Sequence, residues 1–131
     1  MIPMIISDKF FYRKAEDRVQ TAKFAYEKGY YYACSSNLYF ALFNFMQSVL
    51  GKPPEGKWKH IGIFKSFSQI SVEKQLFSTE KLREFGKTYG NLYALRKQAD
   101  YESNVYDDYT IERLKYFVKI TEEVLSHADK S

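Results

Sequence analysis

The sequence predicts an all-α fold, an up-and-down antiparallel helical bundle of four long helices plus one short helix. Apolar residues recur at spacings of three and four over most of the 131 residues, which is the period of an amphipathic helix. No window alternates apolar and polar residues as a half-buried strand would, and we find no internal repeat. Most predicted turns are short, which favours antiparallel neighbours. We expect residues 1–131 to form a single domain.

A short N-terminal arm, residues 1–7, precedes the first predicted helix, and Ser7 and Asp8 are suitable residues for its start. This helix should end at Gly29, because glycine adopts the left-handed conformation that terminates helices. The second helix, residues 30–50, is apolar on most sides and is predicted to be the central one. The tight connection at Gly29 predicts that the two helices form a hairpin.

The main loop is predicted at residues 51–59, where Pro53 and Pro54 prevent a helix from continuing. Its end carries a basic and aromatic patch, Trp58-Lys59-His60. The apolar spacing that follows predicts a short helix over residues 61–70.

Ser78 or Thr79 should cap the next long helix, which is expected to end near Ala99. A polar loop, residues 102–107, separates it from the last helix. Acidic residues near the start of that helix complement its positive end. Its apolar stripe is predicted to comprise Ile111, Leu114, Val118, Thr121 and Leu125.

The composition is notable for aromatic residues, which reach 18% and include 12 tyrosines. So many phenol groups cannot all be buried, and tyrosine-rich surfaces are typical of interfaces, so we expect a homodimer. The net charge of +4 is mildly basic. This balance allows a nucleotide or RNA as partner but does not require one.

Targeting and cofactor signals are absent from the sequence. No signal peptide or apolar run long enough to span a membrane is found, so we expect a cytoplasmic protein with no membrane association. The lone Cys34 should be a small buried hydrophobe rather than a reactive thiol. One cysteine and two distant histidines supply no metal-ligand set, and no glycine-rich phosphate loop occurs. We therefore expect no metal and no cofactor.

Arg96 is the most informative candidate site residue. It continues the apolar face of the fourth long helix, so that face should bring a guanidinium to the core or to a partner surface. Asp100, four residues on, is the nearest carboxylate able to pair with it. The alternative is an exposed ion pair at a helix end. Arginine before aspartate is the less favourable order for such a pair, so we expect a contact between helices or subunits instead.

Two other groups of residues are candidates. Lys59 and His60 could contact an anionic ligand, and the pKa of a histidine suits proton transfer, although a plain surface histidine is the alternative. Tyr31 and Tyr32 could stack on bases, but packing or an interface is the more common role of such a tyrosine run.

Several ordered segments of the chain carry a family resemblance. They are Gly29-Tyr30-Tyr31-Tyr32-Ala33, the aromatic run 39–45, Lys59-His60-Ile61-Gly62-Ile63, Phe67, and Leu92-Tyr93-Ala94-Leu95-Arg96 closing on Ala99-Asp100-Tyr101. In this order and spacing they resemble the HEPN domain family, over roughly residues 15–124. The resemblance implies a helical bundle, commonly a homodimer. It also implies a link to nucleotides or RNA and a prokaryotic two-component module of toxin–antitoxin type with a minimal nucleotidyltransferase.

Many members of that family are metal-independent ribonucleases with an arginine and, a few residues later, a histidine. Arg96 matches the arginine, but Tyr101 stands where the histidine is expected. A tyrosine with a pKa near 10 is a poor base at neutral pH, which speaks against enzymatic activity unless the fold brings His60 to Arg96.

Three functional hypotheses follow. The first is a dimeric partner of a nucleotidyltransferase that binds an anionic ligand near Arg96. The second is a ribonuclease in which Arg96 steadies the scissile phosphate and Tyr101 or His60 moves protons. The third is a nucleotide-binding module without chemistry that uses Lys59, His60, Arg96 and Tyr101.

Overall fold

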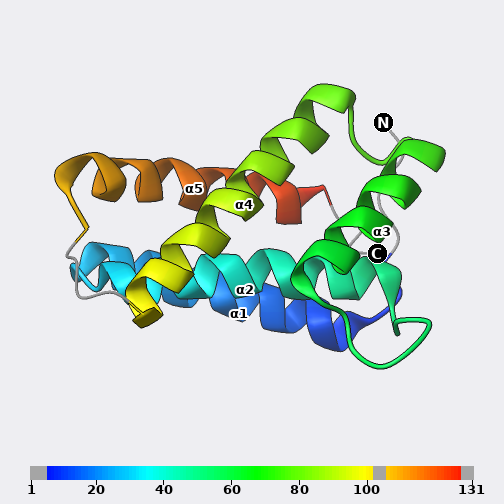
Figure 1. Cartoon of the computed structure of the whole chain (residues 1–131), viewed down its shortest axis with the longest axis horizontal. Helices are drawn as coiled ribbons and strands as arrows, with labels where there is room; N and C mark the ends of the chain where they lie inside the picture. The colour runs from blue at the N-terminus through cyan, green and yellow to red at the C-terminus, as the bar shows by residue number, and fades with distance from the viewer. Residues whose placement is uncertain (1–5, 102–105, 128–131) are drawn as a thin grey trace.

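A computed structural model describes residues 6–101 and 106–127, except for the side chains of residues 99–101. Five helices and no strand occur in this part of the chain (Figure 1). A helical bundle is therefore confirmed. The finer prediction, a regular up-and-down arrangement, is not confirmed, because α4 lies obliquely across α2 in Figure 1. The helices are α1 (Lys9–Glu27), α2 (Tyr31–Leu50), α3 (His60–Glu73), α4 (Thr79–Tyr101) and α5 (Asp108–Ser126).

The hairpin of α1 and α2 agrees with the sequence prediction. The Asp8 carboxylate caps α1 by accepting hydrogen bonds from the backbone N–H groups of Phe10 and Phe11. Gly29 follows the helix end with φ of 80°, in the left-handed region. The backbone N–H of Tyr30 then donates to the carbonyl of Ala25. This tight end turns the chain back, so α1 and α2 lie side by side (Figure 1).

The central position of α2 is confirmed. It contacts all four other helices, and its inward side chains are fully buried. Cys34, near its start, is also fully buried, and burial raises the pKa of the thiol to about 12. Cys34 is therefore an inert core residue, as expected. The fully buried large side chains of α2 are Leu38, Leu42, Phe45 and Met46.

Helix α3 is longer than the predicted range 61–70. It starts at His60 and continues to Glu73, and Gln75 then adopts φ of 53°. This left-handed residue is not a glycine, so the sequence carries no stop signal at the helix end. At the start of α4 the Ser78 hydroxyl accepts a hydrogen bond from the Lys81 N–H, which confirms the predicted cap. The far end of α4 reaches Tyr101, two residues beyond the expected Ala99.

Helix α5 begins behind Asp107, whose carboxylate accepts a hydrogen bond from the Thr110 N–H. Its predicted stripe is buried at Leu114, Thr121 and Leu125 and half-buried at Ile111 and Val118. The apolar face is wider than predicted. It also includes the buried side chains of Phe117, Ile120 and Val124.

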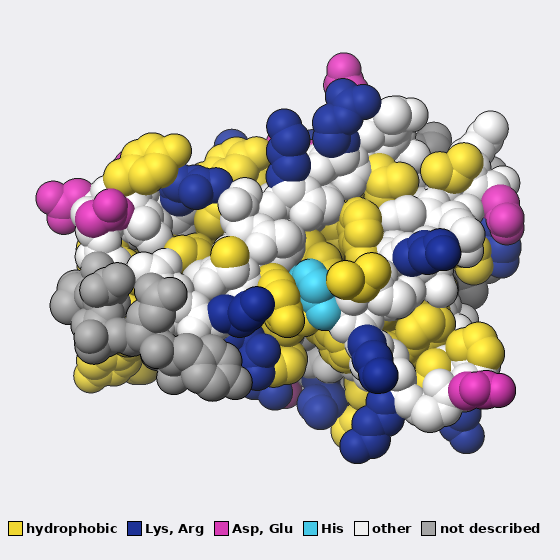
Figure 2. Space-filling model, in the orientation of Figure 1, with side chains coloured by type: hydrophobic (Ala, Val, Ile, Leu, Met, Phe, Trp, Pro, Cys, Tyr) yellow, Lys and Arg dark blue, Asp and Glu magenta, His cyan; other side chains and the backbone are white. Residues whose placement is uncertain are grey.

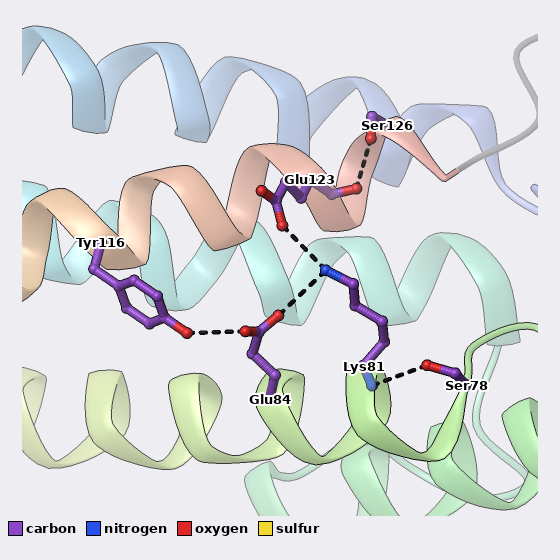
Figure 3. Close-up of polar contacts among 6 residues, drawn as sticks. All are labelled: Ser78, Lys81, Glu84, Tyr116, Glu123 and Ser126. Atoms are coloured by element: carbon purple, nitrogen blue, oxygen red, sulfur yellow. Dashed lines mark hydrogen bonds and ion pairs between the residues drawn. The ribbon is translucent and has the colours of Figure 1, made fainter.

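A polar link joins α4 to α5 at the surface. Figure 3 shows the ammonium of Lys81 between two carboxylates, 3.6 Å from Glu84 and 3.3 Å from Glu123. The Tyr116 hydroxyl donates to Glu84 at 2.9 Å. These groups are largely exposed, so the link contributes little to stability. None of the described helices has the length and apolar character that crossing a membrane requires.

Two glycines of α4 provide a matched test of the α3–α4 contact. A Cβ at Gly86 would lie 2.9 Å from the ring of Phe64 on α3, whereas a Cβ at Gly90 would meet nothing within 4 Å. We expect Gly90→Ala to raise the free energy of unfolding by about 0.5–1 kcal/mol, because alanine favours helix. Gly86→Ala should lower the free energy of unfolding by about 1 kcal/mol, because displacing the Phe64 ring costs more free energy than the higher helix propensity of alanine contributes. Urea denaturation measures both, and equal stabilisation would contradict the packing described.

Candidate anion-binding site

Tyr39 of α2 is the residue around which the candidate site is built. It is 4% exposed, and its ring stacks on that of Tyr89 of α4 with the centroids 5.2 Å apart. His60, the first residue of α3, packs against the same ring at 5.6 Å. The guanidinium of Arg96 lies 5.6 Å from the Tyr39 ring centroid. One buried aromatic ring on the central helix therefore brings His60 and Arg96 to the same place.

The hydrogen bonds around Tyr39 assign the proton positions on His60. The Tyr89 hydroxyl donates to the backbone carbonyl of His60 at 3.1 Å, so in its 3.3 Å contact with the Tyr39 hydroxyl it must accept. Tyr39 thereby donates its only proton to Tyr89. The Tyr39 oxygen, 2.9 Å from His60 Nδ1, then accepts a hydrogen bond from that nitrogen. His60 is therefore the Nδ1–H tautomer, and the lone pair on Nε2 remains available.

The electrostatics keep this network neutral at pH 7. Burial, assisted by the positive charge of Lys97, lowers the pKa of His60 below its usual value of 6.5. Burial raises the pKa of Tyr39 and the pKa of Tyr89. Both phenols thus remain protonated and the imidazole remains uncharged, so the positive charge of the site comes from the surrounding Lys and Arg side chains.

The surroundings of Arg96 differ in part from those that the sequence predicts. The stripe before it is buried at Phe85, Tyr89 and Leu92, but Arg96 itself is only half-buried. Its guanidinium lies over the ring of Phe40 at 4.8 Å as well as over that of Tyr39. Aromatic faces, rather than the interior of the core, therefore surround the charge. The reason is that α2 presents two adjacent rings at the edge of its contact with α4.

The predicted partners of Arg96 lie outside the described side chains. Asp100 and Tyr101 close α4, and their backbone is helical. The prediction that they pair with Arg96 or move a proton stays a prediction. His60 and Arg96 both contact the Tyr39 ring, and the substitution of His60 for the missing histidine stays a prediction.

Tyr93 and Lys97 belong to the site although sequence reasoning did not single them out. The imidazole of His60 stacks on the ring of Tyr93 with the centroids 3.7 Å apart, and the ammonium of Lys97 lies 5.1 Å from that ring. Tyr89, Tyr93 and Lys97 lie four residues apart on α4, which places them on one face. This spacing is the signal in the sequence that could have identified Tyr93 and Lys97. The sequence does not show which helix packs against that face.

An open pocket lies beside the imidazole. It has a volume of about 750 Å³, and its lining includes Lys59, His60 and Tyr93. Trp58 also lines it, and its indole N–H donates to the carbonyl of Gly51 at 2.9 Å, which closes the main loop. Figure 2 shows a histidine side chain at the surface, bordered by hydrophobic side chains and with Lys and Arg side chains on both sides. Lys59 and His60 thus both line one pocket, and their role in contacting a ligand stays a prediction.

Tyr31 and Tyr32 are not part of this pocket. They lie at the start of α2, roughly two helical turns before Tyr39. The ring of Tyr32 packs edge-on against that of Tyr106, with the centroids 4.6 Å apart. Tyr31 and Tyr32 line a separate, apolar pocket of about 520 Å³. Packing is therefore the observed role of Tyr32, and its prediction as a ligand contact stays a prediction. Within the described residues, no group of three or more His, Cys, Asp or Glu side chains is placed to hold a metal ion.

A comparison with protein-family models matches residues 9–130 to the HEPN domain. The match covers nearly the whole chain. This chain belongs to the HEPN domain family. A search of curated proteins found no match. In this HEPN domain the aromatic run of α2 supplies the ring that joins His60 to Arg96, two residues that lie 36 positions apart in the sequence.

Proposed function

We propose that this HEPN-domain protein binds the phosphate groups of a nucleotide or RNA at the surface formed by Lys59, His60, Arg96 and Lys97. We further propose that it acts as a dimer, as the partner of a nucleotidyltransferase in a toxin–antitoxin-type module. The observation that carries the binding proposal is the Tyr39 ring, which contacts both Arg96 and His60, and His60 lines an open pocket.

The composition of the surface suits a phosphorylated ligand. Arginine and lysine donate charge-assisted hydrogen bonds to phosphate oxygens, and Lys59 is exposed at the start of α3. Exposed faces of tyrosine and tryptophan accept stacked bases without sequence preference. The neutral imidazole adds no positive charge at pH 7, so the cations of the rim determine the affinity for the anion.

A binding assay in the presence of a chelator tests this proposal. Labelled single-stranded RNA should bind, with an affinity that falls as salt rises, because phosphate contacts release counterions. Arg96→Gln should weaken binding about tenfold, since a charge-assisted hydrogen bond is lost. Arg83→Gln, an exposed arginine elsewhere on α4, is the matched control and should leave the affinity unchanged. Equal affinities for both variants and the wild type would contradict the proposed site.

The same assay separates binding from ribonuclease activity, which is the second candidate. The observation that favours a ribonuclease is the lone pair on His60 Nε2, which could accept the proton of a 2′-hydroxyl. Because the pKa of His60 is lowered, the base is present at pH 7 and is lost only as the pH falls through that lowered pKa. Cleavage would then decline with falling pH while binding of the anion strengthens. RNA that stays intact at every pH, yet binds, supports the non-catalytic role.

The partnership rests on family membership rather than on the site. HEPN domains commonly form dimers, and two surfaces per assembly would suit a partner enzyme. We expect the protein, expressed together with its genomic neighbours, to co-purify with a nucleotidyltransferase as a complex that contains two copies of this chain. A monomer that retains no nucleotidyltransferase through size-exclusion chromatography would refute the partnership and leave the binding proposal untouched.

A further inference from the structure

We propose that a groove between α4 and α5 is a docking site for an acidic segment of a partner protein. The groove has a volume of about 340 Å³ and shares no lining residue with the pocket beside His60. The inference therefore goes beyond the proposed function and does not depend on it. The residues that would contact the acidic side chains are Arg83 and Lys87 of α4 and Arg113 of α5.

The groove exists because the side of α4 that lines it is charged and polar rather than apolar. Its α4 residues recur at spacings of three and four from Glu80 to Asn91, which is one face of the helix. Tyr116 and Phe117 line it from α5, and Phe117 is buried. The α4 face is about 16 Å long at the rise of an α-helix. This length suits three turns of a bound helix or about five residues of an extended peptide, and it exceeds a single small anion.

The cations of the groove have no carboxylate partner. Within the part of the chain that the structure describes, no acid lies within ion-pair distance of any of the three. Glu84, three residues before Lys87, is engaged instead by Lys81 and by the hydroxyl of Tyr116 (Figure 3). Arg83 and Lys87 are four residues apart, a spacing at which like charges repel on a helix. An anion supplied from outside the chain would relieve this repulsion.

Two further groups of the groove are ready to bind an acceptor. The guanidinium of Arg113 lies 5.6 Å from the centroid of the Tyr109 ring and 5.1 Å from that of Phe117. These rings restrict the side chain, so ordering it in a complex costs less entropy. On α4, Thr88 lines the groove and is 2% exposed, and its hydroxyl has no hydrogen-bond partner among the described residues. This hydroxyl can donate to a carboxylate oxygen.

The mixed charge of the lining favours a peptide over a nucleic acid. Glu80 and Glu84 line the same groove as the three cations. A nucleic acid strand carries a phosphate at every nucleotide, so some phosphates would lie against these carboxylates. A peptide can place acidic side chains opposite the cations and a basic side chain opposite Glu80. Exposed rings of Tyr109 and Tyr116 flank the groove, and tyrosine and arginine are enriched at protein–protein interfaces.

A synthetic peptide provides the test. The probe is a fluorescein-labelled, alanine-rich peptide of about 16 residues, long enough to form a helix, with one lysine near its start and three glutamates at helical spacing after it. A second peptide carries glutamine in place of each glutamate. Fluorescence anisotropy should show the glutamate peptide binding about tenfold tighter than the glutamine peptide, because charge-assisted hydrogen bonds are lost in the latter. Its affinity should fall as salt rises.

Substitutions in the groove locate the binding site of the peptide. Arg113→Gln and Lys87→Gln should each weaken the glutamate peptide about tenfold. Arg13→Gln, an exposed arginine on α1, is the matched control and should have no effect. Thermal unfolding verifies that each variant is folded. Because Arg113 packs on Phe117 and Lys87 is exposed, Lys87→Gln retains the test if Arg113→Gln fails to fold.

The outcomes separate this inference from the proposed function. A glutamate peptide that binds no tighter than the glutamine peptide, or that binds Lys87→Gln as well as Arg13→Gln, overturns the docking site. If Arg113→Gln weakens labelled RNA as much as the peptide, the groove is a nucleic-acid surface and the inference is wrong. Arg96→Gln should weaken RNA and leave the peptide unchanged. Loss of RNA binding alone would therefore count against the proposed function and leave the docking site intact.

Discussion

The contact on which the site depends is the packing of Tyr39, a single residue of the central helix, against two other helices at once. Its ring stacks on Tyr89 of α4 and its hydroxyl is hydrogen-bonded to His60 at the start of α3. The ring is buried, so it cannot move without opening the core. Because α3 and α4 both pack on this residue, His60 and Arg96 contact the same ring although α3 and most of α4 separate them in the chain.

The second property of the site is its division into a neutral centre and a charged rim. The two phenols and the imidazole exchange hydrogen bonds without carrying charge, which buried polar groups can do at little cost. Lys59, Arg96 and Lys97 surround them nearer to solvent. The guanidinium of Arg96 lies over the rings of Tyr39 and Phe40, and the ammonium of Lys97 lies over the ring of Tyr93. In the proposed function, the charged rim binds phosphate and the imidazole contacts the ligand.

Local signals in the sequence predicted local structure well. Asp8, Gly29, Ser78 and Asp107 mark helix ends as their side chains or backbone preferences require. The end of α3 was missed because Gln75 takes a left-handed conformation without the usual glycine. Arg96 and His60 were recognisable as candidate site residues, whereas Tyr39 and Tyr93 appeared only as members of aromatic segments. Their roles arise only when α3 and α4 meet on α2, and such contacts between distant segments depend on the tertiary packing of the whole chain.

The protonation of His60 in solution tests the central claim most directly. Long-range nitrogen-15 to proton correlations distinguish the two ring nitrogens, and His127, which makes no such contact with a tyrosine hydroxyl among the described residues, is an internal comparison. The hydrogen-bond network predicts a proton on Nδ1 and an unprotonated Nε2 at neutral pH, and loss of this preference in Tyr39→Phe. A wild-type His60 protonated on Nε2 alone, or unchanged by Tyr39→Phe, would show that Tyr39 does not organise the site.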